Sequence, residues 1–300
     1  MNSKRSLLFS LFFLPSMAWA ELKPEIIQIP SGTKWTLTET SKMEVQSLKM
    51  QRQNQALDTS ATRNSKLVYG ARVLADNSIE LKVKEHEILV DEEPQGWTFA
   101  DEVGYFSWTK DGYDADEAKL TVDGEIDEAW FEWLSFRPVA WSYQDVLDGK
   151  VRKLGDEWKV ALDGVGFFGF PQGPFTGELN LVYLEDTKFE GREVASLSMK
   201  GDLTGKLEGR PGLTKIKFES TFLCDPVSGL TVSSKTAGTF SAEIKEAVDG
   251  HGVGEVKQGF DIEETVHFLT EEEVAAEDKE IEAALEGDLD EALESDDDDE

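Results

Sequence analysis

The chain has 300 residues, of which 39% are hydrophobic, with a formal net charge of -31 and a single cysteine. Its length allows one large domain or two modest ones. So acidic a chain repels the phosphates of nucleic acids and anionic membrane surfaces, and we therefore exclude both as partners. Cys224 cannot form an intramolecular disulfide, and its strand-like flanks predict a buried, inert thiol.

Residues 1–20 have the pattern of a cleaved secretory signal peptide. Lys4 and Arg5 precede an apolar run at residues 7–14, and small residues occupy the two positions that a signal peptidase reads. The apolar run is too short for a membrane-spanning helix, which needs about 20 residues. The sequence therefore predicts cleavage before Glu21 and a periplasmic or secreted protein.

Most of residues 24–269 predicts antiparallel β-structure. Apolar and polar residues alternate with a period of two, which places one face of each strand inward and the other outward. The alternating or strand-like runs are at residues 35–50, 79–84, 179–183, 215–222 and 260–268.

Turn sequences separate these runs. Residues 225–229 are predicted to close a hairpin between strands at 215–224 and 230–236. Only residues 127–134 have a helical pattern within this region. The other turn sequences are Asp76-Asn77, Asp111-Gly112, Asp123-Gly124 and Glu190-Gly191.

A weak internal repeat suggests two similar β-rich halves, 21–135 and 136–270. Gly-Thr-Lys-Trp at residues 32–35 and Gly-Asp-Glu-Trp at 155–158 each precede a later Leu-Val-Tyr, at 67–69 and 181–183. In both, the glycine is expected to supply the turn into a strand and the tryptophan to bury a large ring. A chance match is the alternative.

The segment Lys153–Val160, which follows Arg137-Pro138-Val139, resembles an element of uncharacterised secreted bacterial β-rich proteins. Those proteins combine a signal peptide with two similar β-rich halves, and a Gly-Asp-x-Trp sequence opens the second half. The resemblance implies an exported two-half β-protein and brings no activity with it. The first half departs from the pattern, because Thr33 stands where the aspartate is expected.

The C-terminal tail, residues 271–300, contains seventeen acidic residues and one lysine. Apolar residues at spacings of seven or four between Val274 and Leu293 predict a narrow helical stripe, which Gly287 weakens. The acidic run at residues 295–300 cannot pack and is predicted to be disordered. The tail is interpreted as a solvated helix; a docking helix for a partner and a loose binder of cations are the alternatives.

Residues 164–169 spell Gly-x-Gly-x-x-Gly, the dinucleotide-binding pattern. That site needs a helix whose first amides hold the pyrophosphate, and Pro171 and Pro174 exclude one here. The match is therefore interpreted as accidental. Residues 163–175 are predicted to form a Gly/Phe/Pro-rich loop that covers a sheet edge or pocket.

No arrangement of catalytic or metal-binding residues is recognised, so we predict no enzyme activity, no cofactor and no metal. His86, His251 and His267 lack metal-ligand spacing. An EF-hand register around Asp123 lacks its first and last ligands.

Two weaker alternatives remain open in the same region. One is an irregular calcium site among Asp111, Asp114 and Asp116. The other is a glycosidase pair of Glu128 and Glu132, which would share one face of the short helix beside two tryptophans.

Aromatic residues are concentrated between residues 97 and 175. Large rings are ordinary core residues of a β-fold, but their surplus here could line a pocket for an apolar ligand or stack on sugars. The predicted ligand-binding residues are Trp97, Trp108, Trp130, Trp133, Phe167, Phe168 and Phe170.

The predicted fold is all-β: an antiparallel sandwich or half-open barrel, with two similar halves and an acidic helical or disordered tail. The predicted function is that of a non-catalytic, exported binding or carrier protein of the cell envelope, with an apolar small molecule in an aromatic-lined concavity. The alternatives are a protein-interaction or structural module that uses the acidic tail to bind an envelope protein, and a protein that binds or acts on polysaccharide.

Overall fold

The computed structural model describes residues 21–23, 25, 27–52, 55–58, 60–96, 98–109, 112–120, 130, 131, 134, 146–167, 170–205, 212–244, 253–277 and 279. The predicted signal peptide lies outside these residues and stays a prediction. In the part of the chain that is described, every helix is too short or too polar to cross a bilayer.

Strands dominate the described chain. In chain order the elements are β1 (Lys34–Arg52), β2 (Gln55–Asp58), β3 (Thr62–Val73), β4 (Ile79–Val90), β5 (Glu93–Pro94), β6 (Val103–Thr109), β7 (Gly112–Ala115), α1 (Glu117–Leu120), β8 (Glu157–Phe167), β9 (Phe170–Phe189), β10 (Arg192–Gly205), β11 (Gly212–Cys224), β12 (Thr231–Ile244) and β13 (Val253–Phe268).

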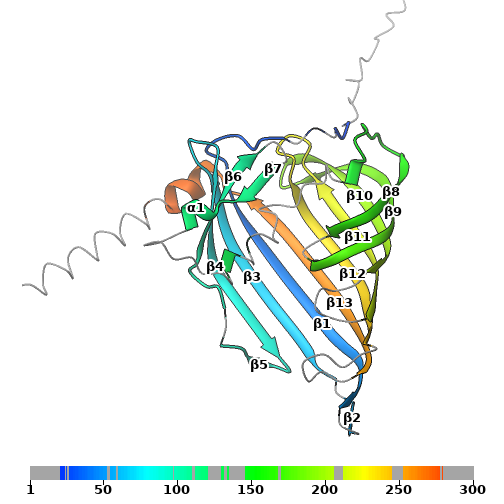
Figure 1. Cartoon of the computed structure of the whole chain (residues 1–300). Helices are drawn as coiled ribbons and strands as arrows, with labels where there is room; N and C mark the ends of the chain where they lie inside the picture. The colour runs from blue at the N-terminus through cyan, green and yellow to red at the C-terminus, as the bar shows by residue number, and fades with distance from the viewer. Residues whose placement is uncertain are drawn as a thin grey trace, which may run out of the picture.

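All thirteen strands belong to one sheet, in the order β7-β6-β4-β3-β1-β13-β12-β11-β10-β9-β8, with β2 paired to β1 and β5 to β4. The first and last long strands pair antiparallel from Trp35 with Phe268 to Gln51 with Val253, so the two predicted halves join at the middle of the sheet. The sheet curves into a half-open barrel (Figure 1). The all-β prediction is confirmed, and of its two forms the half-open barrel is the one observed.

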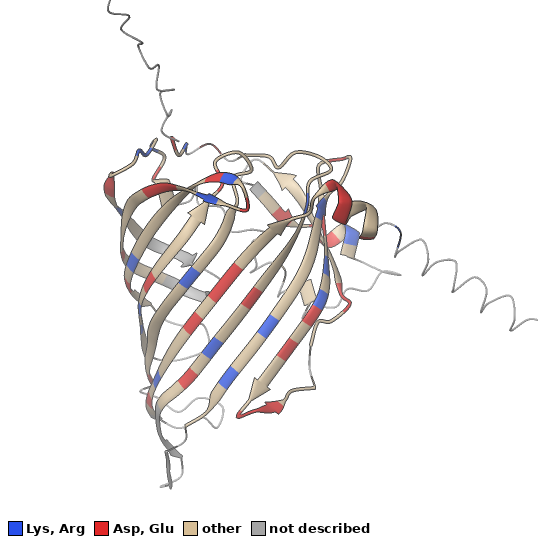
Figure 2. Cartoon of the chain, turned by 180° about the vertical axis from the view of Figure 1, so that it is seen from behind, with Lys and Arg blue, Asp and Glu red and all other residues tan. Residues whose placement is uncertain are grey.

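The period-two pattern separates the two faces of the sheet. On β13, Phe260, Val266 and Phe268 are buried, whereas Asp261 and Glu263 between them are exposed. We call the side with the buried residues the inner face and the other side the outer face. Figure 2 shows the sheet from its outer side, with charged residues spread along most strands.

Ion pairs within and between strands cover the outer face, with N–O distances of 2.5 to 3.0 Å. Exposed pairs of this kind stabilise a fold only slightly, but they indicate a hydrated surface. They are Lys42–Glu44, Lys66–Glu85, Arg72–Glu80, Lys159–Glu178, Lys200–Glu219, Lys217–Asp202 and Lys235–Glu263.

The predicted Glu190-Gly191 turn and the predicted hairpin at 225–229 are both confirmed. Glu190 and Gly191 join β9 to β10 with φ of 48° and 80°, the left-handed pair that suits a tight hairpin turn. The turn between β11 and β12 is held by Asp225, whose carboxylate accepts hydrogen bonds from Val227 N at 2.8 Å and Ser228 Oγ at 2.9 Å. Cys224 beside it is buried as predicted, and burial raises the pKa of its thiol well above the usual value.

The predicted loop at 163–175 is wrong. Residues 163–167 form the end of β8 and residues 170–175 the start of β9, with Phe167 paired to Phe170. Pro171 and Pro174 both lie in β9, before Phe175, the first β9 residue whose pairing with β10 is described. The first two glycines of the Gly-x-Gly-x-x-Gly sequence therefore lie in β8, and the sequence is followed by β9.

The predicted helices are described only in part. Trp130, Phe131 and Leu134 are helical, and the rest of 127–134 lies outside the described residues. The tail is helical at residues 271–277 and at Lys279, and residues 280–300 also lie outside. Helix α1, a single turn, was not predicted.

Of the two sequence motifs in the predicted repeat, only Gly-x-x-Trp has equivalent contacts at both of its positions. Gly32 N donates to Val73 O, and Gly155 N donates in the same way to Tyr183 O. Tyr183 belongs to its own Leu-Val-Tyr, whereas Tyr69 lies four residues before Val73. The Leu-Val-Tyr segments therefore occupy different positions in the two strand pairs, and the duplication stays a prediction.

Candidate ligand-binding surface

The inner face carries two apolar clusters. The first lies mainly on β1, β3, β4 and β6, with further residues from β10, β12 and β13, and is covered by two aromatic residues from connecting segments. Phe99 and Trp130 pack against each other there, with ring centroids 5.1 Å apart. The indole nitrogen of Trp130 donates to Val103 O at 3.0 Å, which fixes the ring over the end of β6.

The second cluster lies mainly on β8 to β11 and is covered by Leu22, Val146 and Leu147. Trp158 Nε1 donates to Val146 O at 2.7 Å, and the Arg152 guanidinium lies 4.7 Å from the Trp158 ring centroid. Both covers therefore use an indole N–H to hold a connecting segment against the sheet.

A polar belt separates the two clusters along β1, β12 and β13. Glu39 lies directly opposite Glu264, and Ser234 Oγ donates to Glu264 Oε2 at 2.7 Å. Beside them, two hydroxyl pairs are each joined by a hydrogen bond. These are Ser41 with Ser65 at 2.6 Å and Ser220 with Thr236 at 2.8 Å.

The inner face also has apolar side chains that are only partly buried. They come from β1, β8, β12 and β13, and they pack against the second cluster on the far side of the polar belt from the first cluster. These residues, which we call the accessible apolar row, are Met43, Val160, Leu162, Phe240 and Ile262. Sequence analysis did not select them, because single aliphatic residues in alternating strands look the same whether or not something covers them.

The structure places only two of the predicted ligand-binding side chains. Trp130 is 3% exposed and belongs to the core of the first cluster. Trp108 is half-buried and packs edge-on against Tyr113 at 4.8 Å, near the opposite end of β6 from Val103. These two indoles are not close to each other, since they lie near opposite ends of β6, and the prediction for the whole set is not tested.

The other predicted residues cannot be compared in this way. Trp97, Trp133 and Phe168 lie outside the described residues. Phe167 and Phe170 form a backbone pair in the β8–β9 hairpin, and their side chains are not described.

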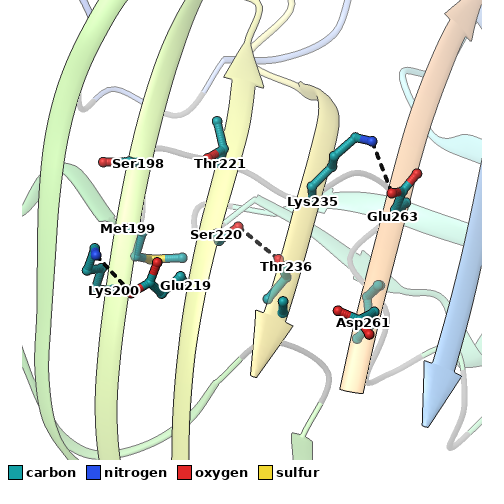
Figure 3. Close-up of a pocket in the computed structure, with 12 residues that line it drawn as sticks. Ser198, Met199, Lys200, Glu219, Ser220, Thr221, Lys235, Thr236, Asp261 and Glu263 are labelled. Carbon is teal, nitrogen blue, oxygen red and sulfur yellow. Dashed lines mark hydrogen bonds and ion pairs between the residues drawn. The ribbon is translucent and has the colours of Figure 1, made fainter. Parts of the chain in front are cut away.

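Two open grooves lie on the outer face, one on each side of β13. They have volumes of ≈ 310 and ≈ 370 Å³ and share Asp261 and Glu263. Figure 3 shows the first, which is bordered by the Lys200–Glu219 and Lys235–Glu263 ion pairs. Such charged, open surfaces suit water better than an apolar ligand.

The described histidines have structural contacts. His86 Nδ1 accepts a hydrogen bond from Phe99 N at 3.0 Å, and the two rings are stacked. His267 contacts two glutamates at the end of β13. His251 lies outside the described residues, and those residues contain no group of three His, Cys, Asp or Glu that could hold a metal ion.

The alternative calcium residues are engaged in local hydrogen bonds. Asp114 accepts from Thr109 Oγ1 at 3.0 Å, and Asp116 accepts from Ser107 Oγ at 2.5 Å. Asp111, Glu128 and Glu132 lie outside the described residues, so both weaker alternatives stay untested.

No protein-family model matches the chain, and no curated protein matches it. Among solved structures, one of lipovitellin concerned with its lipid–protein interactions is similar over 80% of this chain and 25% of lipovitellin, with 8% identity and a TM-score of 0.43. An outer membrane channel from Pseudomonas putida F1 is similar over 84% of this chain and 99% of the channel, with 11% identity and a TM-score of 0.22. The chain thus spans a quarter of the length of lipovitellin. Both TM-scores are too low to support a shared function.

Proposed function

We propose that the chain is a non-catalytic, exported binding or carrier protein of the cell envelope that holds an apolar ligand on its inner face. The accessible apolar row carries this proposal. Five apolar side chains from four strands face the same side and are left partly open to solvent. Apolar surface gathered in a concave position is the usual lining of a small-molecule site.

The contrast between the two faces supports the same function. The outer face carries ion pairs and stays hydrated, so the protein can remain soluble while its inner face takes up apolar material. The polar belt next to the accessible apolar row could orient a ligand that has one polar end, because binding sites combine apolar walls with a few fixed polar groups.

The cellular location in this proposal depends on residues 1–20. A cleaved signal peptide would deliver the mature chain to the periplasm or the medium. The resemblance of Lys153–Val160 to secreted β-rich proteins supports that location. The strong negative charge directs the proposal away from nucleic acids and anionic membrane surfaces.

Native mass spectrometry of the protein purified from its own host tests the proposal directly. We expect a bound mass that organic extraction removes and that is identified as an apolar or amphipathic molecule. A protein that is always free of ligand, together with no binding of a fluorescent fatty-acid probe, would contradict the proposal.

A pair of variants on β13 tests the location of the ligand. Ile262→Lys places a charge in the accessible apolar row, and Thr265→Lys places the same charge on the exposed face of the same strand. We expect Ile262→Lys to weaken probe binding by about tenfold or more and Thr265→Lys by less than about twofold, since only the first buries a charge against the ligand. Equal effects would place the ligand elsewhere.

A second candidate function is contact with a cationic partner through the acidic tail. It is supported by the helix at 271–277, which is fixed to the sheet by ion pairs, so the acidic residues after it start from a defined point. Removal of residues 280–300 should abolish capture of such a partner without changing binding of the fatty-acid probe.

A further inference from the structure

The tail begins in a fixed geometry directly after β13. Thr270 and Glu273 cap the helix reciprocally. Glu273 Oε2 accepts from both Thr270 N and Thr270 Oγ1 at 2.8 Å, and Glu273 N donates to Thr270 Oγ1 at 3.3 Å. This is a capping box, which fixes both the start of a helix and the position of its carboxylate.

His267 joins this helix to the opposite half of the sheet. Its Nδ1 lies 2.9 Å from both carboxylate oxygens of Glu190 in the β9–β10 turn, and its Nε2 lies 3.0 Å from Glu273 Oε1. A neutral imidazole has only one N–H, so it can donate to only one of these carboxylates. The doubly protonated ring donates to both.

Two lysines hold the other end of the same helix. Glu277 Oε1 lies 2.9 Å from Lys84 Nζ, and Glu277 Oε2 lies 3.8 Å from Lys34 Nζ. These contacts place the helix on the outer face near the start of β1 and the middle of β4, beside the sheet in Figure 1.

The sheet has local features that allow Lys84 to reach the helix. Val68 pairs with Glu85 and Tyr69 pairs with Val83, so Lys84 is the extra residue of a β-bulge. Its side chain crosses β3 over Gly70, where an added Cβ would lie 2.8 Å from Lys84 Cε. A larger residue at position 70 would displace the lysine.

We propose that residues 267–277 form a pH-controlled latch, which holds the start of the acidic tail against the outer face while His267 is doubly protonated and releases it when His267 loses a proton. The released segment carries seventeen acidic residues and one lysine. The latch does not depend on the proposed apolar ligand, which would bind on the inner face.

The charged groups around His267 determine the pH range. Glu190 faces it from the β9–β10 turn and Glu273 from the tail, and their hydrogen bonds raise the pKa of His267 above 6.5. Arg192, at the start of β10, stacks on Phe268 and pairs with Asp225.

The contribution of His267 is therefore complete below pH 6.5 and is lost as the pH rises through its elevated pKa. The pKa of Glu273 is lowered to about 2, first by its Thr270 contacts and then by His267. Its contribution is complete above pH 4.5 and is lost as the pH falls towards about 2. The latch is therefore tightest between pH 4.5 and 6.5.

A spin label on Ala275 measures release in the whole chain. Ala275 is exposed on the helix, and the natural Cys224 is buried, so Ala275→Cys provides one accessible thiol. We expect an immobilised spectrum at pH 5.5 and a mobile one at pH 9, with the ratio of mobile to immobile label rising roughly two- to fivefold, as befits exposed ion pairs. High salt should raise that ratio at pH 5.5.

Three further variants separate the latch from general loosening. In the His267→Gln variant the spin label should be mobile at both pH values. In the His267→Arg variant, which keeps the positive charge, the label should stay immobilised and its spectrum should no longer change with pH. In the Glu277→Gln variant the spin label should be more mobile at both pH values, but its spectrum should still change with pH. A wild-type spectrum that does not change with pH, or a step that persists in His267→Gln, overturns the proposal; circular dichroism confirms that each variant is folded.

Discussion

The two Gly-x-x-Trp sequences open their strands with nearly the same geometry. Gly32 and Gly155 have φ of 83° and 84°. Each donates its amide to the neighbouring strand, Gly32 N to Val73 O at 3.0 Å and Gly155 N to Tyr183 O at 2.9 Å. The tryptophan three residues later faces inward in both. A short local sequence is therefore sufficient to set this local structure.

Their surroundings differ. Trp35 is on β1 in the middle of the sheet, between Phe268 of β13 and Ala71 of β3. Trp158 is on β8, the last strand of the sheet order, and has a strand neighbour only in β9. Its indole N–H is bonded to Val146 O, whereas the buried Trp35 N–H has no acceptor among the described residues. The same motif therefore has different energetic roles in the two places.

Truncation of the two tryptophans should show the largest difference in stability. Trp35→Ala should lower the free energy of unfolding by about 3–5 kcal/mol, because it leaves a cavity between two strand neighbours. Trp158→Ala should cost less, since the edge strand can relax around the gap. Urea denaturation of both variants checks this; an equal or reversed order would mean that sheet position does not decide the cost.

The glycines, in contrast, should respond alike. An added Cβ has open space at both Gly32 and Gly155, so only the left-handed backbone opposes it. Gly32→Ala and Gly155→Ala should each cost about 1–2 kcal/mol. Gly96→Ala serves as the control, because Gly96 also has open space and no positive φ, and it should be close to neutral. Unequal costs for the two motif glycines would show that the surroundings of each glycine also affect the cost of its substitution.

Sequence patterns predicted the fold because alternation and turn residues act locally. The alternation at residues 260–268 predicted the inner face of β13 correctly, and Glu190-Gly191 forms a turn as predicted. The strand residues within 163–175 were missed because a Gly/Phe/Pro-rich composition is typical of a loop. Pro171 and Pro174 nonetheless lie in β9.

The candidate site was less accessible to sequence reasoning. The predicted ligand-binding residues were all aromatic, yet Trp130 is a buried core residue. The accessible apolar row is made of residues such as Met43 and Ile262, whose partial exposure depends on how far the curved sheet leaves them uncovered. The link between His267 and Glu190 joins positions 77 residues apart, and only the folded sheet brings them together.

Replacement of each tryptophan by phenylalanine gives the smallest predicted effect and isolates the indole N–H. Trp158→Phe removes the indole N–H that donates to Val146 O. It should therefore lower the free energy of unfolding by about 1 kcal/mol more than the loss of buried ring area alone would. Trp35→Phe removes a buried donor that has no acceptor among the described residues, so the lost area is partly offset. Urea denaturation should therefore find Trp35→Phe the milder change, although Trp35→Ala is the harsher truncation. If Trp35→Phe is instead the more damaging, the Trp35 N–H must have an acceptor outside the described residues.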